Sequence, residues 1–72
     1  MTDQFSVFWW DKDGGQHTEI KFVDAETALQ RAKGLSSGPA ATVLEVVNRI
    51  IITDAMDLVC YEWIAGKGVV FP

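Results

Sequence analysis

The chain has 72 residues, a length that allows one domain, and such a domain buries only about 60% of the surface that its unfolded chain exposes. Its single cysteine excludes an internal disulfide, and one cysteine with one histidine cannot provide the four ligands of a structural zinc site. Ten acidic against six basic residues give a formal net charge of −4, which on average repels nucleic-acid backbones and anionic lipid surfaces.

An aromatic-rich segment, residues 5–10, and an alternating segment, residues 16–23, lie on either side of a polar stretch. We predict a β-hairpin, because Asp13 and Gly14 can adopt the positive φ angles that a tight primed turn requires. Pairing about this turn defines the partners on the core face, which are Trp9 with Thr18, Val7 with Ile20, and Phe5 with Phe22. The reverse face then carries side chains that are polar except for two large aromatics: Ser6, Phe8, Trp10, His17, Glu19 and Lys21.

A helix is predicted to begin after Asp24, whose carboxylate can accept hydrogen bonds from the free amide groups of the first turn. Small and apolar residues then recur at intervals of three and four and form one stripe: Ala25, Ala28, Leu29, Ala32 and Leu35. The small side chains allow the helix to lie close to a sheet. Several turn-forming residues follow, and they predict that the helix ends near Lys33 and that a loop extends to about Ala41.

A segment rich in valine and isoleucine, residues 42–53, and a second apolar segment, residues 58–64, predict another hairpin with a four-residue turn between them. We favour the register in which Arg49 opposes Glu62, because opposite charges that face each other across a ladder stabilise it. The same register pairs Thr53 with Leu58, Ile52 with Val59, Ile51 with Cys60 and Ile50 with Tyr61.

This register sorts the second hairpin into two faces. The better core face carries Leu44, Val46, Ile50, Ile52, Val59, Tyr61 and Trp63. The opposite face carries Val47, Arg49, Ile51, Leu58, Cys60, Glu62 and Ile64. Beyond residues 65–68, the apolar residues 69–72 are expected to add an edge strand.

These elements predict one α+β domain over residues 1–72, in which a single helix packs on one face of a mostly antiparallel sheet of four or five strands in the order ββαββ. The second half, with RIIITD at 49–54, EW at 62–63 and GKGVVFP at 66–72, resembles a group of short, uncharacterised bacterial proteins of about this length. The resemblance implies a ββαββ domain in which dimers are plausible. No activity is known for the group, so the resemblance implies no catalytic or binding residue.

Three residue groups invite a chemical role, and each has a simpler explanation. Asp11 and Asp13 suggest a calcium loop, but glycine stands at the fourth and fifth positions and not at the sixth, where an EF-hand requires it. His17 and Glu19 share a strand face, yet two residues do not make a metal site or an acid-base pair. Cys60 lacks a neighbouring base and is interpreted as a small hydrophobe. We therefore predict no catalytic residue, no metal, no cofactor and no enzymatic activity.

The adjacent Trp9 and Trp10 must point to opposite faces of a strand, and a single helix covers only one of these faces. We therefore expect an apolar contact surface on the uncovered face, unless the C-terminal segment folds over it. The expected interface consists of Phe8, Trp10, Val47, Ile51, Leu58, Cys60 and Ile64. The leading hypothesis is a homodimeric interaction module, which associates through this face or through an edge strand and whose further protein partner is unidentified.

Two other functions remain open. In one, Phe8 and Trp10 stack the bases of single-stranded nucleic acid. The net charge disfavours this function, and the basic residues that could lie near the rings are few: Lys12, Lys21 and Arg49. In the other, the acidic surface inhibits a basic protein partner. The amino terminus lacks the features of a targeting signal, and no apolar run approaches the roughly 18 residues of a membrane span, so we expect a cytoplasmic protein.

Overall fold

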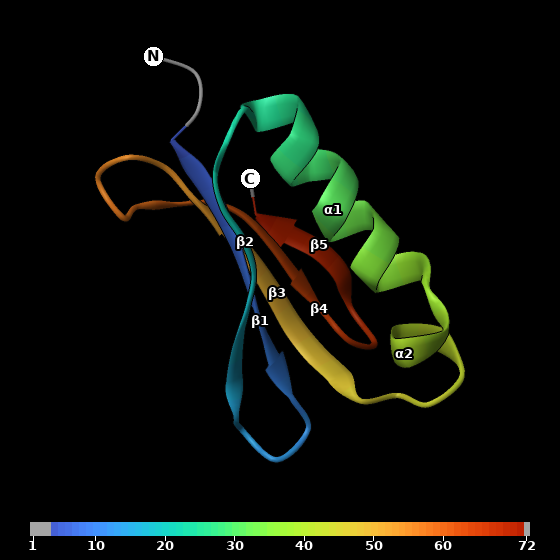
Figure 1. The fold of residues 1–72 in the computed structure, drawn as a ribbon. Helices are drawn as coiled ribbons and strands as arrows, with labels where there is room; N and C mark the ends of the chain where they lie inside the picture. Colours follow the sequence, from blue (N-terminus) through green and yellow to red (C-terminus); the bar gives the residue numbers. More distant parts are fainter. Residues whose placement is uncertain (1–3, 72) are drawn as a thin grey trace.

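Five strands and two helical segments make up residues 4–71, the part of the chain that the computed structural model describes (Figure 1). In chain order they are β1 (Phe5–Asp11), β2 (Gln16–Val23), α1 (Ala25–Ser37), α2 (Pro39–Thr42), β3 (Val47–Thr53), β4 (Val59–Ile64) and β5 (Gly68–Phe71). Neighbouring strands pair antiparallel in the order β2-β1-β3-β4-β5, so β2 and β5 are the edges. The predicted α+β class and antiparallel sheet are confirmed, and the sheet has five strands. Pro72 of the predicted last strand lies outside the described residues.

The loop of the first hairpin contains three residues, not two. The N–H of Gly14 donates to the carbonyl of Asp11 at 3.1 Å, and the N–H of Asp11 donates to the carbonyl of Gly15 at 2.9 Å. The Asp11 carboxylate supports this wider loop, because its Oδ1 atom accepts from the N–H groups of Asp13 and Gly15 at 2.9 and 2.8 Å. Gly14 has a φ of 88°, as the αL position of such a loop requires, and the prediction of a tight primed turn is wrong.

The three-residue loop shifts the predicted pairing of β1 with β2 by one residue next to the turn, and two irregularities farther along the ladder change the register again. The observed pairs are Phe5 with Val23, Val7 with Ile20, Phe8 with Thr18 and Trp9 with His17. Phe22, predicted in the core, is 69% exposed instead. His17 and Glu19, predicted on the reverse face, lie on the helix side of the sheet. The His17 ring stacks on Trp9 with centroids 4.1 Å apart, and Glu19 accepts from Arg31 of α1 at 3.2 Å.

Asp24 caps α1 as predicted, with its Oδ1 atom accepting from the N–H of Thr27 at 2.9 Å. The helix continues to Ser37, so the predicted end near Lys33 is wrong. Its last turn is stabilised by the hydroxyl groups of Ser36 and Ser37, which donate to the carbonyl of Lys33 at 3.0 and 2.8 Å. These bonds satisfy an acceptor that a helix end otherwise exposes to water.

The segment between α1 and β3 is helical and turn-like, which corrects the prediction that a strand begins at residue 42. Pro39 opens α2, a position that suits its fixed φ angle and missing N–H. Its carbonyl accepts hydrogen bonds from the N–H groups of Val43 and Leu44, both at 2.9 Å. The N–H groups of Val43 and Leu44 therefore donate within this segment and do not pair with a neighbouring strand. Strand β3 begins only at Val47.

The turn of the second hairpin lies where it was predicted, but its loop has three residues and not four, because the N–H of Asp54 donates to the carbonyl of Leu58 at 3.0 Å. Thr53 pairs with Val59 and not with Leu58, and beyond an irregularity the ladder is shifted by two residues. Ile52 pairs with Tyr61 and not with Val59. A shift of two preserves the faces, so the core residues of both strands stay on the helix side: Ile50, Ile52, Tyr61 and Trp63. The predicted ion pair is also present, with Arg49 Nε 2.6 Å from Glu62 Oε2, although the two residues lie diagonally across the ladder.

A third irregularity moves Val47 into the core. Trp10 pairs with Arg49 and Asp11 pairs with Val47, which leaves Asn48 as an extra residue of β3. Val47 therefore faces α1 and is only 1% exposed, so its predicted place on the opposite face is wrong. Two residues predicted in the core are exposed instead: Leu44 and Val59.

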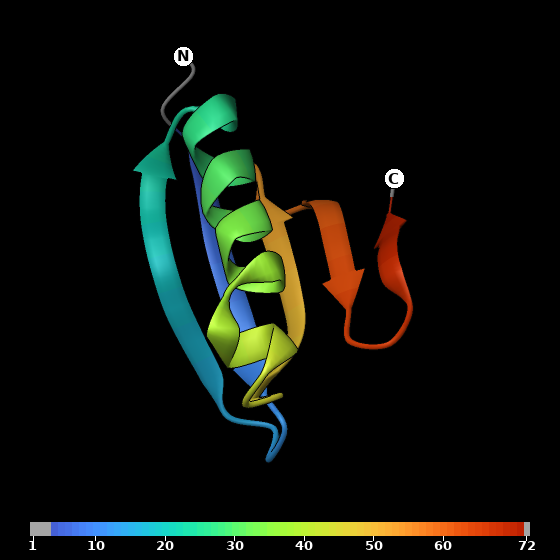
Figure 2. The same cartoon turned by 90° about the vertical axis from the view of Figure 1, so that its right-hand side faces the viewer.

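The core lies between α1 and one part of the sheet. Its buried side chains are Val7, Ala28, Ala32, Val47, Ile50, Ile52 and Tyr61. Helix α1 packs against β1, β2 and β3. Figure 2 shows that β5 lies past the helix and has no layer above it. The core therefore reaches Tyr61 and Trp63 of β4, whereas β5 lies outside the cover of the helix.

Candidate protein interface

The structure places the residues of the expected interface in three different regions. Several lie on the sheet face opposite α1, here named the open face: Phe8, Trp10, Ile51 and Ile64. Leu58 is exposed beside the β3–β4 turn, whereas Val47 belongs to the core. Cys60 is the extra residue of β4 at an irregularity next to Ile52, and it lines a cavity under α1 with Leu29. The predicted positions of Val47 and Cys60 on the open face are therefore wrong.

Trp9 and Trp10 point to opposite faces, as predicted. Trp9 packs against the core, and Trp10 lies on the open face beneath Arg49. The guanidinium carbon of Arg49 is 4.8 Å from the centroid of the Trp10 ring, and its Nε atom binds Glu62. Because the cation is held by both the indole and the carboxylate, it forms a charged cover over this aromatic side chain.

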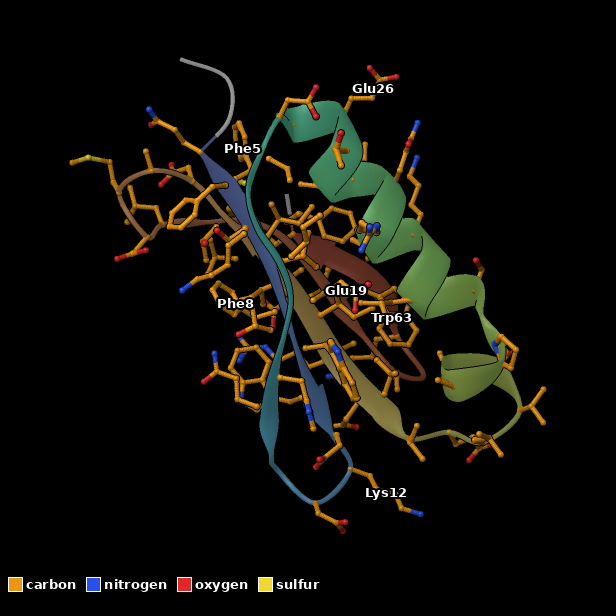
Figure 3. All side chains as sticks on the ribbon, viewed as in Figure 1. Phe5, Phe8, Lys12, Glu19, Glu26 and Trp63 are labelled. Carbon is orange, nitrogen blue, oxygen red and sulfur yellow. The ribbon has the colours of Figure 1, made fainter. Side chains whose placement is uncertain are left out.

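A second aromatic cluster lies beside the β3–β4 turn. Figure 3 shows Phe8 on the side of the sheet away from α1, with Trp63 on the helix side. The ammonium of Lys21 lies 5.9 Å from the ring centroid of Phe8 and 5.7 Å from that of Phe22. These residues line a cavity of about 410 Å³ together with Asp54 and others. The cation of this chain already occupies the faces of both rings.

The open face is consequently less apolar than predicted. Ile51, at its centre, is only 7% exposed, and Trp10 is covered by Arg49. This geometry also bears on the nucleic-acid hypothesis, since base stacking needs a free aromatic face. On the face of the indole that Arg49 covers, a base could stack on Trp10 only if it displaced the guanidinium group.

The β4–β5 hairpin carries exposed apolar residues that the sequence did not place in the interface. Its exposed hydrophobic residues are Val59, Val69, Val70 and Phe71. On the helix side, a mostly apolar cavity of about 430 Å³ separates α1 from β4. It is lined by Phe5, Ala25, Leu29, Lys33, Ile52, Cys60 and Tyr61. The sequence predicted β5 as an edge strand, but the expected interface did not include it. The lack of charged residues in this strand could have indicated a contact surface.

Cys60 has the surroundings of a structural thiol. Its Sγ atom donates to the carbonyl of Ile52 at 3.4 Å. Partial burial raises the pKa of the Cys60 thiol above its ordinary value, and the Asp54 carboxylate raises it further. A raised pKa reduces the thiolate fraction, so this environment does not activate a nucleophile.

Asp11 and His17 form a polar pair that supports the first hairpin. His17 Nε2 lies 2.8 Å from Asp11 Oδ2, and this hydrogen bond is the main reason that the pKa of Asp11 is lowered. The N–H of Gly15 lowers it further by donating to the same carboxylate. Both carboxylate oxygens of Asp11 therefore make hydrogen bonds that stabilise the first hairpin. Within residues 4–71, no cluster of three or more His, Cys, Asp and Glu side chains is arranged to hold a metal ion.

No known protein family, curated protein or solved structure matches this chain. The resemblance of its second half to short bacterial proteins therefore stays a prediction. Neither helix within the described part of the chain combines the length and apolar character needed to cross a membrane.

Proposed function

We propose that this chain is a homodimeric protein-interaction module and not an enzyme. The observation that supports the proposal is the uneven cover of the sheet, because α1 packs on β1, β2 and β3 and leaves β5 without a layer above it. β5 exposes Val69, Val70 and Phe71, and an apolar cavity lies between α1 and β4. Contiguous apolar surface of this kind is uncommon on a protein that acts alone, and it is typical of contact surfaces.

The size of the chain supports the same function. A domain of 72 residues has a small core, and a second copy would bury apolar surface that one copy leaves in water. Association with a folded partner also stabilises the folded state by mass action. A homodimer therefore supplies stabilisation that an internal disulfide cannot supply, because the chain has a single cysteine.

Light scattering coupled to size-exclusion chromatography tests the proposal. We expect a mass of twice the 8.0 kDa of one chain at the upper end of a concentration series from about 10 to 500 μM, a range that suits a small interface. The mass should fall toward that of one chain on dilution. A mass of 8.0 kDa throughout the series would refute self-association.

Trp10→Asp separates the two surfaces on which the dimer could form. The indole lies under Arg49 on the open face, so we expect the variant to keep the dimer mass if association uses the β4–β5 hairpin. Loss of the dimer, with an unchanged far-ultraviolet circular dichroism spectrum, would assign the interface to the open face that the sequence predicts.

A further inference from the structure

Phe22 has an unusual backbone and an unusual position for a phenylalanine. Its φ is 60°, in the left-handed region that strains a residue with a Cβ atom, and bulky side chains most of all. The other two non-glycine residues with positive φ within residues 4–71, Glu45 and Asp57, lie in loops, whereas Phe22 lies inside β2. Its side chain is also 69% exposed, so burial in the core does not offset the strain.

A β-bulge produces this conformation. Between two regular pairs of β1 with β2, one residue of β1, Ser6, stands opposite two residues of β2, Lys21 and Phe22. The N–H of Phe22 donates to the hydroxyl oxygen of Ser6 at 3.4 Å. The bulge brings the Phe22 ring beside the same ammonium group as the Phe8 ring of the open face. Bulges that redirect a side chain in this way, and strained residues that packing does not explain, are typical of functional sites.

The two rings line the cavity of about 410 Å³ together with two carboxylates of the β3–β4 turn, those of Asp54 and Asp57. The Oδ1 atom of Asp54 accepts two hydrogen bonds within the turn. Its Oδ2 atom and the carboxylate of Asp57 accept none from residues 4–71. Aromatic faces and unoccupied carboxylate oxygens are both groups that bind an organic cation.

Lys21 shows which chemistry the cavity accepts. Its ammonium lies 5.9 Å from the ring centroid of Phe8 and 5.7 Å from that of Phe22. No carboxylate of residues 4–71 forms an ion pair with it, and the side chain is exposed. Because an ammonium group is strongly hydrated, it returns to water easily, and another cation can take its place over the rings.

We propose that this cavity binds an arginine side chain of a basic protein partner, which displaces Lys21 from the two rings. A guanidinium group is more weakly hydrated than an ammonium group, stacks on aromatic faces and pairs with a carboxylate through two parallel hydrogen bonds. The cavity supplies both kinds of contact. The net charge of −4 attracts a basic partner, and the carboxylates repel a phosphate backbone.

The surface around the cavity favours a protein segment over a free guanidinium compound. Met56 and Leu58, in and beside the same turn, are 77% and 63% exposed. They offer apolar contacts to the residues that flank an arginine in a chain. The site does not depend on the proposed homodimer, because neither the cavity nor these two residues belong to β5.

The first test is a titration of ¹⁵N-labelled protein with a blocked pentapeptide that has leucine on both sides of a central arginine, followed by nuclear magnetic resonance. The largest shifts should occur at the amides of Lys21, Phe22 and the β3–β4 turn. The same peptide with citrulline, which keeps the shape but lacks the charge, should bind at least about tenfold more weakly. Equal binding of the two peptides would refute the cation site, and equal binding of arginine amide would refute the protein segment as its occupant.

The second test removes the competing cation. Lys21→Met keeps an unbranched side chain without the charge, and we expect it to bind the arginine peptide about two- to fivefold more tightly, because no cation–π contact has to be broken. Lys12→Met is the matched control, since it changes the net charge equally at an exposed position of the first hairpin loop. Equal tightening in both variants would show a general effect of charge and would overturn the role of Lys21.

The third test separates binding from folding. Phe22→Gly removes one ring and suits the positive φ, so we expect a urea midpoint at or above that of the wild type and at least about threefold weaker binding of the arginine peptide. Phe71→Ala removes an exposed phenylalanine of β5, outside the cavity, and should leave binding unchanged. Undiminished binding by Phe22→Gly would exclude this ring from the site.

A purely structural role of Phe22 predicts the opposite result for stability, which is a lower urea midpoint for the glycine variant. That result would remove the reason to assign the residue a binding role. Absence of binding in both wild type and Lys21→Met would refute the site and leave the homodimer untouched, because the solution mass is measured separately.

Discussion

At the scale of single residues, the turns of both hairpins are built in the same way. Asp54 Oδ1 accepts from the N–H groups of Met56 and Leu58, as Asp11 does in the first hairpin. The position that needs a left-handed backbone is Gly14 in one loop and Asp57, with a φ of 61°, in the other. A residue with a Cβ atom is strained there by roughly 1 kcal/mol, although aspartate tolerates it better than most.

We therefore expect Asp57→Gly to raise the free energy of unfolding, by up to about 1 kcal/mol, since glycine adopts this conformation without strain. Asp57→Ala is the matched control and should lower it, because alanine has a Cβ atom and lacks the local tolerance of aspartate. Urea unfolding followed by tryptophan fluorescence measures both. An alanine variant as stable as the glycine variant would contradict this reading of the turn.

Two half-buried carboxylates, those of Asp24 and Asp11, link the stability of the fold to pH. The Thr27 hydrogen bonds at the start of α1 hold the pKa of Asp24 below its ordinary value of 3.8, and the His17 hydrogen bond does the same for Asp11. A carboxyl group with a lowered pKa in the folded state contributes stability above its unfolded pKa. That contribution is lost as the pH falls through the folded value.

Wild-type protein should therefore lose stability between pH 7 and pH 3, and the loss should be smaller in Asp24→Asn. Asparagine still caps the helix but has no charge to titrate. Asp11→Asn tests the hairpin in the same manner. Unfolding free energies from urea titrations at both pH values measure the effect, and identical losses in wild type and variants would argue against it.

At the scale of elements, the contact between α1 and the sheet depends on small side chains. Ala28 and Ala32 are both 0% exposed, and they face Val7 and Ile50 in the core. Ala25 begins the same stripe but is exposed at the edge of the cavity near Cys60. The helix therefore lies close to the sheet at its middle and has free space near its first turn.

Ala28→Leu should consequently destabilise the fold by about 1 to 3 kcal/mol, because the added methyl groups force α1 away from the sheet. Ala25→Leu adds the same atoms next to open space and should change stability by no more than about 0.5 kcal/mol. Thermal and urea unfolding compare the two variants. Similar losses at both positions would show that the middle of the helix has more room than its burial indicates.

At the scale of the whole molecule, one helix cannot cover the sheet. Five strands at a spacing of about 4.8 Å span roughly 19 Å, whereas a helix with its side chains is about 10 to 12 Å wide. The chain has one long helix, and its connection to β2 places it over β1, β2 and β3. β5 lies outside the cover of the helix as a consequence of the strand order.

Much of this architecture follows from short-range patterns. The alternation of residues along the strands predicted both hairpins, and the N-cap at Asp24 predicted where α1 begins. The rule that neighbours in a strand point to opposite sides predicted that Trp9 and Trp10 separate. These features depend on residues close together in the chain, so local sequence is sufficient to determine them.

The positions that sequence could not assign lie at irregularities of the ladder. An extra residue in one strand turned Val47 into the core and Cys60 toward α1, and an irregularity near the end of β2 left Phe22 exposed. The three-residue loop of the first hairpin turned His17 to the helix side. Where such a residue is inserted depends on how neighbouring strands pack and twist against one another. The alternation of polar and apolar residues along a strand therefore does not show where an extra residue is inserted.

The sequence by itself determined the α+β class, the hairpins, the helix start and the faces of Ile50, Ile52, Phe8 and Trp10. Only the tertiary structure decided the order of the strands, the place of Val47 in the core and the cover of Trp10 by Arg49. The physical reason is distance along the chain. Periodicity and capping act over a few residues, whereas strand order, bulges and cover depend on contacts between segments that are far apart in sequence.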